Sequence, residues 1–138
     1  MTMNRVTLIT LGVKDLTRAC AYYDAIGWIP ETVLENVAFY DMGGAKFGFF
    51  PLDMLAAEQG RPVEDLSNGA MTLAQNFNSR LEVDAQFATA LAAGATKVTD
   101  PVETAWGGYS GYVADPDGHI WEFAHNPFWT LNEEGHIA

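Results

Sequence analysis

Apolar positions repeat along the chain in a pattern that predicts short strands and two amphipathic helices. Residues 5–13, RVTLITLGV, are rich in β-branched and aliphatic side chains and predict a strand. Apolar residues then recur at spacings of three and four, which predicts a helix with Asp15 as its N-cap and Gly27 as its end. The apolar stripe of this helix consists of Leu16, Ala19, Tyr23 and Ile26.

The rest of the first half alternates in the way that strands do. Three extended segments are predicted at 28–36, 37–43 and 45–50. Gly43-Gly44 predicts a hairpin turn between the last two segments. A looser stretch follows from Pro51 to Ala70 and holds a predicted short helix at 53–59.

The same order of elements then occurs a second time. A strand is predicted at 71–79 and a helix at 83–95, with Gly94 near the helix end. Three more strands are predicted at 97–104, 109–115 and 119–125. Because the helix-ending glycines and the hairpin turns occupy matching places, the simplest account is an internal repeat of a βαβββ unit.

Composition limits the partners that such a chain can have. A chain of 138 residues with 49% hydrophobic content can bury one sizeable core, so a single domain is expected. The formal net charge is −11, which argues against nucleic acid and anionic membranes because both require neutralisation by Lys and Arg. A neutral or cationic small ligand fits this charge better.

The single cysteine and the apolar runs place the chain in the cytoplasm. Cys20 has no second cysteine to pair with, and its position beside Ala19 and Tyr23 predicts a buried structural thiol. The N-terminal residues MTMNRVTLIT do not resemble a signal peptide, and no apolar stretch reaches the roughly 18 residues that a membrane span needs.

An acidic turn and a lone carboxylate mark the end of the second repeat. Asp115-Pro116-Asp117-Gly118 is typical of a type I turn in which Asp115 accepts a backbone hydrogen bond, and we interpret it as structural. After the turn, Glu122 lies between Trp121 and Phe123 in an alternating run. A carboxylate in that setting needs a partner.

Two segments of the sequence resemble signatures of a known superfamily. VKDLTRACAYYDAIGW is similar to the first-helix signature of the vicinal oxygen chelate superfamily, the glyoxalase and bleomycin-resistance fold, and ADPDGHIWEF is similar to its final-strand signature. The resemblance covers residues from about 5 to 127. The fold hosts isomerases, dioxygenases, thiol transferases and drug-sequestering proteins, so the resemblance indicates the fold more specifically than the function.

The resemblance implies an α+β fold in which two βαβββ repeats form a curled mixed sheet, a cup with the helices outside. With that fold, the period-2 alternation of strands assigns the two faces. Trp121 and Phe123 are expected to pack under the helix, and Ile120, Glu122 and Ala124 are expected to face the cup.

Superfamily members that bind a divalent metal take ligands from the first and last strands of each repeat. Carried over by register, these four positions are Leu8, Gly48, Thr72 and Glu122. Only Glu122 is a competent ligand, and a register slip by one residue does not improve the set. We therefore expect no metal cofactor, with a zinc, nickel, manganese or iron ion as the alternative.

The histidines do not restore a metal site. His119 is expected to serve the turn or the entry into the strand, and His125 to cap its strand end or pack against the tail. His136 is expected to lie in a mobile C-terminal segment.

The residues assigned to the cup are amphipathic, as in many small-molecule pockets. They are Leu8, Thr10, Lys46, Gly48, Phe50, Thr72, Ala74, Asn76, Tyr112 and Glu122, with Trp106 on a loop that we expect to fold over the cup. Of these we predict ligand binding by Leu8, Lys46, Phe50, Thr72, Asn76, Trp106, Tyr112 and Glu122. Glu122 itself has three possible partners: Lys46, a cationic ligand group, or a proton that would let it act as a catalytic acid or base.

Two function hypotheses follow from this site. In the first, the protein is a metal-free binding or sequestering protein for a small planar or cationic organic molecule. In the alternative, it is a metal-dependent glyoxalase-like lyase or isomerase, or a dioxygenase, with a non-standard ligand set.

The expected organisation is one domain over residues 1–138. It comprises repeat one at 5–51, a connector at 52–70, repeat two at 71–127 and a C-terminal tail at 128–138. The tail carries Phe128, Trp129 and Leu131, which a monomer would have to fold back or expose. We therefore predict a C2 homodimer.

Overall fold

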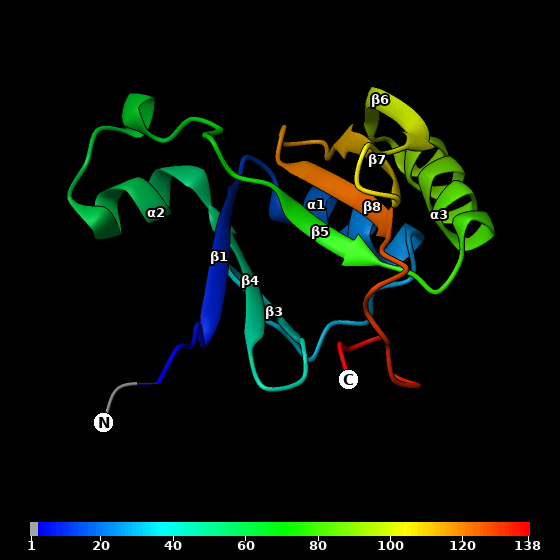
Figure 1. Ribbon diagram of the computed structural model, residues 1–138. Helices are drawn as coiled ribbons and strands as arrows, with labels where there is room; N and C mark the ends of the chain where they lie inside the picture. The colour runs from blue at the N-terminus through cyan, green and yellow to red at the C-terminus, as the bar shows by residue number, and fades with distance from the viewer. Residues whose placement is uncertain (1–2) are drawn as a thin grey trace. The chain divides into compact units, whose positions relative to one another are not determined.

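The computed structural model describes residues 3–138, and the chain divides into two compact units at Ser67 and Asn68. Each unit contains one βαβββ repeat with its own open four-stranded mixed sheet (Figure 1), which confirms the predicted α+β class and the internal repeat. Of the helices within residues 3–138, none has the length and apolar character that crossing a membrane would require.

The first unit has its strands in the order β1-β4-β3-β2, with β1 parallel to β4 and the other pairs antiparallel. Its elements are β1 (Leu8–Val13), α1 (Leu16–Ala25), β2 (Thr32–Val33), β3 (Ala38–Asp41), β4 (Lys46–Pro51), α2 (Leu52–Gln59) and a 3-10 turn (Val63–Asp65).

The helix α1 forms where its end signals predicted it. The Asp15 side chain accepts a hydrogen bond from the Arg18 amide at 3.1 Å, as an N-cap does, and Gly27 beyond its end has a φ of 101°. Its buried face contributes Tyr23, whose ring stacks on Phe49 of β4 with centroids 4.6 Å apart. Tyr40 and Trp28 complete an aromatic core on this side of the sheet.

The helix α2 packs on the side of the first sheet opposite that core. Gly12 alternates with the buried Leu11 and Val13, so its missing side chain would point the other way. A Cβ added there would lie 2.6 Å from a methyl carbon of Leu52 and 3.3 Å from one of Leu55. Because Gly12 has no side chain, α2 can pack closely on this end of the sheet.

The second unit repeats the topology in the order β5-β8-β7-β6. Its elements are β5 (Leu73–Asn76), α3 (Arg80–Ala93), β6 (Thr96–Glu103), β7 (Tyr109–Ala114) and β8 (Ile120–His125). The strands β5 and β8 are parallel, and β8, β7 and β6 are antiparallel to one another in turn. Val83, Phe87 and Ala90 form the buried side of α3, which packs on β7 and β8.

Several predicted boundaries differ from the structure, and two of the differences have identifiable reasons. The helix α3 begins at Arg80, not at 83, because Ser79 accepts a hydrogen bond from the Glu82 amide at 3.2 Å and acts as its N-cap. The segment 28–36 pairs only at β2, because Trp28 is part of the aromatic core and Pro30 has no amide hydrogen to donate.

The acidic turn between β7 and β8 is structural, as predicted. One Asp115 carboxylate oxygen accepts hydrogen bonds from the Asp117 and His119 amides, each at 2.9 Å, and the Asp115 carbonyl accepts one from the Gly118 amide. Gly118 has a φ of 84°, a conformation that glycine adopts without strain. This five-residue connection, 115–119, fixes the register that pairs Tyr112 with Glu122.

Candidate functional site

The second sheet has one face covered by α3 and one face opposite it, which we call the open face. Trp121 and Phe123 are buried on the α3 side, and Gln75 contacts Gln86 of α3 there. Glu122 alternates with the two buried aromatics and therefore points to the open face, as the alternation predicted.

Glu122 lies in the middle of the open face and is bound to Tyr112. It is directly opposite Ala74 of β5 on one side and Tyr112 of β7 on the other. The Tyr112 hydroxyl donates a hydrogen bond to the Glu122 carboxylate. Burial, together with the charge of Glu122 and this hydrogen bond, raises the pKa of Tyr112. The phenol therefore stays neutral, and able to donate, to a higher pH than an ordinary tyrosine.

Positive charge is scarce in this unit. Residues 68–138 contain only one arginine and one lysine, Arg80 and Lys97. Arg80 forms an ion pair with Glu103 at 3.2 Å, and Lys97 forms one with Asp100 at 3.4 Å. Within the second unit, the Glu122 carboxylate thus has a hydrogen-bond donor in Tyr112, whereas Arg80 and Lys97 neutralise Glu103 and Asp100.

Two further polar side chains belong to the open face. Asn76 and Ser110 lie in β5 and β7 on either side of Ala124, and Ser110 is buried. The alternation predicted Asn76 on this face. Ser110 was not predicted, although it has the same parity as Tyr112. Thr72 was assigned to the inner face, but it is exposed and precedes the first residue of β5.

Trp106 lies in the turn that joins β6 to β7. A Cβ added to Gly108 would lie only 2.0 Å from the Trp106 ring, so the indole rests against the backbone of its own turn. The side chain is 49% exposed. The flanking glycines are thus explained by the close approach of the indole to Gly108 and by the φ of 97° at Gly107.

The first unit places its candidates on the side of the sheet opposite the aromatic core. Leu8 and Lys46 are register partners at one end of the β1–β4 pair, and Phe50 pairs with Gly12 near the other end. The ammonium group of Lys46 forms an ion pair with the Glu31 carboxylate. In this unit, therefore, Glu31 neutralises Lys46.

The positions that correspond to metal ligands do not fit a metal ion. In the first unit, a Cβ at Gly48 would meet the Phe39 ring at 3.3 Å, so an aromatic side chain lies where a ligand would project. The direct partners in the parallel pairs are Thr10 for Gly48 and Ala74 for Glu122, and neither supplies a strong donor. Within residues 3–138, no group of three or more His, Cys, Asp or Glu side chains could hold a metal.

The histidines and the cysteine have local contacts. A ring nitrogen of His125 lies 2.9 Å from the Phe77 carbonyl oxygen, which confirms its role at the strand end. His136 lies in a small hairpin whose Leu131 and Ile137 form an isolated β-bridge. Cys20 is half-buried, not buried as predicted, and burial, followed by the hydrogen bond with Cys20, raises the pKa of Tyr40.

Comparisons with known proteins agree with this architecture. A model of the Glyoxalase/Bleomycin resistance protein/Dioxygenase superfamily matches residues 4–123. The crystal structure of a glyoxalase-related enzyme from Fulvimarina pelagi is similar with a TM-score of 0.91 and 33% identity, over 99% of this chain and 98% of that chain. A hypothetical protein of S. aureus shares the fold with a TM-score of 0.79 and 19% identity, over 91% and 96% of the two chains.

A shorter similarity links the chain to mycobacterial proteins. An uncharacterized protein of Mycobacterium bovis is 55% identical over 40 residues, which are 29% of this chain and 26% of the relative. The match thus spans about a quarter of the length of that relative. The superfamily model and the similarity to the Fulvimarina pelagi structure both extend over most of the chain, and the chain therefore belongs to the Glyoxalase/Bleomycin resistance protein/Dioxygenase superfamily.

Proposed function

We propose that this protein binds a small organic cation on the open face of its second sheet, without a resident metal, and that Glu122 is the anchor for the positive charge. The observation that carries the proposal is the environment of Glu122: a part-buried carboxylate with a hydrogen bond from Tyr112, in a unit whose one arginine and one lysine are paired with Glu103 and Asp100. An ionised carboxylate accepts about four hydrogen bonds, so a ligand ammonium or amidinium group can bind beside Tyr112.

The remaining candidates supply shape and polarity for such a ligand. Asn76 and Ser110 offer an amide and a hydroxyl on the same face as Glu122, and Trp106 offers an exposed ring for stacking. That Leu8, Lys46, Phe50 and Thr72 bind a ligand stays a prediction from the sequence. The superfamily typically binds small molecules, which supports a ligand in general and leaves its class to the chemistry of these residues.

A metal-dependent reaction is the second candidate, because the similar Fulvimarina pelagi protein is described as a glyoxalase-related enzyme. The superfamily often uses divalent metals, but Leu8, Gly48 and Thr72 offer no strong donor at the family positions. A lyase, isomerase or dioxygenase activity would need a different ligand set. In that case Glu122 would be its catalytic acid or base.

Thermal-shift and calorimetric titration with matched probes tests the proposal. Benzamidine, a planar cation, should bind more tightly than benzamide, its neutral isostere, because only the cation forms a charged hydrogen bond with Glu122. Glu122→Gln should keep the fold and reduce benzamidine affinity by about tenfold to a hundredfold, which corresponds to about 1.5–3 kcal/mol. Glu133→Gln, which removes an equal charge from the tail, is the control and should change little.

Two results would overturn the proposal. One is equal binding of benzamidine and benzamide, or equal loss of benzamidine binding in the Glu122→Gln and Glu133→Gln variants. The other is one equivalent of zinc, nickel, manganese or iron in the purified protein that is lost in Glu122→Gln. That second result would establish the metal-dependent candidate.

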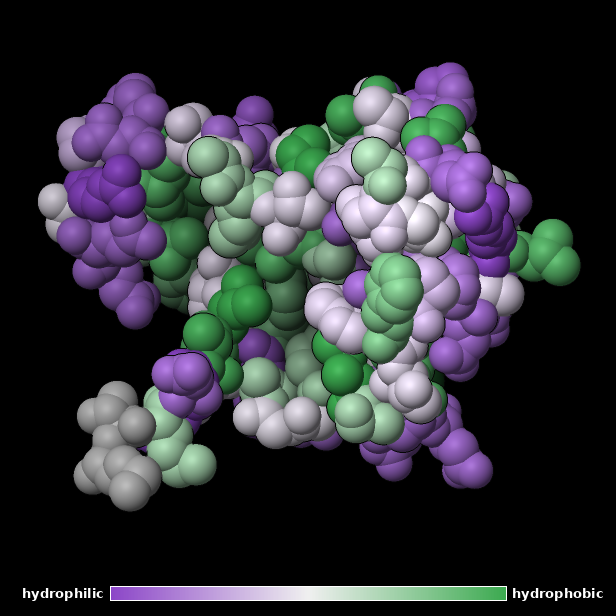
Figure 2. Space-filling view, in the orientation of Figure 1, coloured by the Kyte–Doolittle hydropathy of each residue, from purple (hydrophilic) through white to green (hydrophobic). Residues whose placement is uncertain are grey.

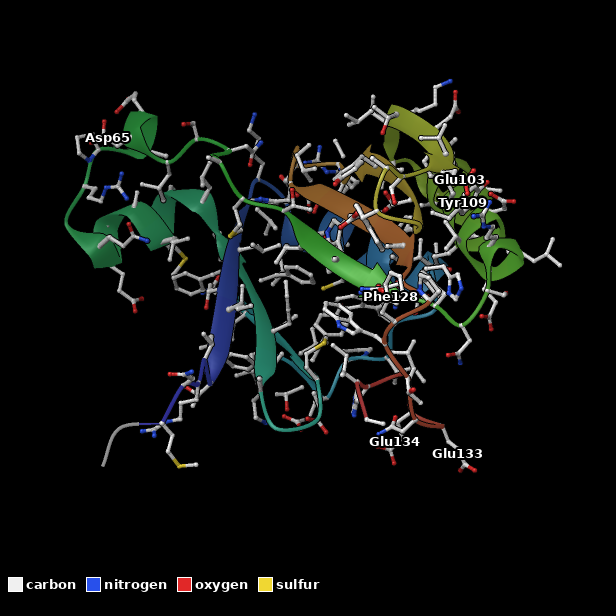
Figure 3. The ribbon with its side chains drawn as sticks, in the orientation of Figure 1. Asp65, Glu103, Tyr109, Phe128, Glu133 and Glu134 are labelled. Carbon is white, nitrogen blue, oxygen red and sulfur yellow. The ribbon has the colours of Figure 1, made fainter. Side chains whose placement is uncertain are left out.

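We also infer a C2 homodimer through the C-terminal tail. The tail leaves Phe128 75% and Trp129 50% exposed. Phe128 is labelled in Figure 3, and Figure 2 shows, in green, that apolar residues are among those on the surface. Exposed aromatic side chains of this kind are enriched in protein interfaces, and members of the superfamily typically form oligomers. Sedimentation of the wild type and of Phe128→Ser tests the inference, and a wild-type monomer of 15.1 kDa at micromolar concentration would contradict it.

A further inference from the structure

Both strands of the β6–β7 hairpin, whose turn carries Trp106, make a side-chain contact with α3. Glu103 and Tyr109 are the last paired residues of β6 and β7 before the turn. The Glu103 carboxylate binds Arg80 of α3 at 3.2 Å, and the Tyr109 hydroxyl donates a hydrogen bond of 2.6 Å to Asp84 of α3. Figure 3 shows Glu103 and Tyr109 close together beside α3.

The two attachments reinforce each other. Arg80 and Asp84 are four residues apart and therefore project from the same side of the helix. The Arg80 guanidinium also lies over the Tyr109 ring, 5.1 Å from its centroid, in a cation–π contact. The hydrogen bond with Asp84 is the main cause that raises the pKa of Tyr109, which keeps the donating hydroxyl protonated.

Above these attachments the turn is closed by its own hydrogen bonds. The Thr104 amide donates to the Gly108 carbonyl at 2.9 Å, and the Thr104 hydroxyl accepts from the Gly108 amide at 2.9 Å. The Trp106 ring rests on Gly108, and the Phe128 ring lies about 3.9 Å from where a Cβ of Gly107 would be. The position of the indole is thus set by Gly108, the residue immediately before Tyr109.

We propose that Asp84 and Tyr109 are positioning residues: their hydrogen bond on the α3 side fixes the turn 104–108 and thereby the orientation in which Trp106 meets a ligand. We call the Asp84–Tyr109 hydrogen bond the clamp. Its role in ligand binding rests on the proposed function, because Trp106 is a ligand contact only if the protein binds an aromatic cation. Its structural effect does not depend on a ligand. Neither residue touches the open face around Glu122, so the clamp would act on ligand binding only through the turn.

The experiment uses the full chain labelled with 5-fluorotryptophan, which gives one fluorine NMR signal for each of the four tryptophans. Trp106→Phe identifies the Trp106 signal by its loss. Tyr109→Phe and Asp84→Ala should each shift and broaden that signal and speed hydrogen exchange at Gly107 and Gly108. Asp84→Asn, whose amide oxygen still accepts a hydrogen bond, should largely restore the wild-type signal.

Asp100→Ala is the matched control, because it also removes an exposed aspartate from the second unit, where it pairs with Lys97. It should leave the Trp106 signal and the exchange rates unchanged. Tyr109→Phe retains the ring and its contact with Arg80, so it keeps the test informative if Asp84→Ala fails to fold. An unchanged Trp106 signal in Tyr109→Phe, or an equal change in Asp100→Ala, would overturn the proposal.

Benzamidine titration of the same variants then addresses the ligand. If the clamp orients Trp106 for binding, Tyr109→Phe should weaken benzamidine binding and Asp84→Asn should retain it. If benzamidine does not bind the wild type at all, the proposed function fails while the fluorine and exchange results still decide whether the clamp exists.

Discussion

Replacing Tyr112 with Phe tests the pairing at the centre of the candidate site. The substitution removes only the hydroxyl that donates to Glu122 and keeps the ring in β7. A hydrogen bond to a charged group is worth about 1.5–3 kcal/mol when buried, and we reduce this to about 1 kcal/mol because both side chains are partly exposed. In a chain of 138 residues, that loss lowers the melting temperature by about 3–5 °C.

The loss should also depend on pH in a defined direction. Burial and Glu122 raise the pKa of Tyr112 above the ordinary tyrosine value of about 10. A group whose pKa is raised by folding stabilises the folded state fully below its unfolded pKa, and this contribution disappears as pH rises through the folded pKa. The stability difference between wild type and Tyr112→Phe should therefore be constant from neutral pH to about pH 10 and shrink above it.

Urea unfolding of the wild type, Tyr112→Phe, Glu122→Gln and the double variant measures both effects. The double-mutant cycle isolates the pair, and it should give a coupling free energy of about 1 kcal/mol at neutral pH. A coupling energy near zero at neutral pH, or one that persists unchanged where Tyr112 is ionised, would refute the reasoning. The hydroxyl would then have a partner other than Glu122.

Three further predictions concern the scaffold that presents the site. Gly111→Ala should cost about 1–3 kcal/mol in urea unfolding, because its Cβ would lie 2.8 Å from the backbone nitrogen of Pro101; wild-type stability would contradict this close approach. Asp115→Ala should destabilise by about 1–3 kcal/mol in urea unfolding, since it leaves two backbone amides without their acceptor; loss of a bound divalent ion in place of this destabilisation would mark the turn as a metal site. Gly48→Glu should lower the melting temperature without creating zinc binding in calorimetry, because the Phe39 ring lies at that position; tight zinc binding by this single variant would show that the site accepts a ligand after all.

The repeat and the element types were determined locally, and so the sequence predicted them. The Asp15 cap, the glycines with positive φ and the acidic turn act through neighbouring residues, so their signals lie within a few positions of the structure that they specify. Alternation in β8 likewise predicted that Glu122 lies on the face of the sheet away from the buried Trp121 and Phe123, because successive side chains of a strand point to opposite faces.

The partners of the site residues depended on the pairing of distant strands, which no local pattern encodes. Register across β7 and β8 gives Glu122 a tyrosine, whereas the sequence left Lys46, a ligand or a proton as its partners. In the first unit, Lys46 binds Glu31, which is fifteen residues away. The Phe39 ring covers Gly48 because the pairing of β3 with β4 brings these two residues, nine apart, directly opposite each other. The sequence thus determined which face each side chain occupies, and only the tertiary structure decided which side chains meet on that face, since register is set by turns and packing outside the strand itself.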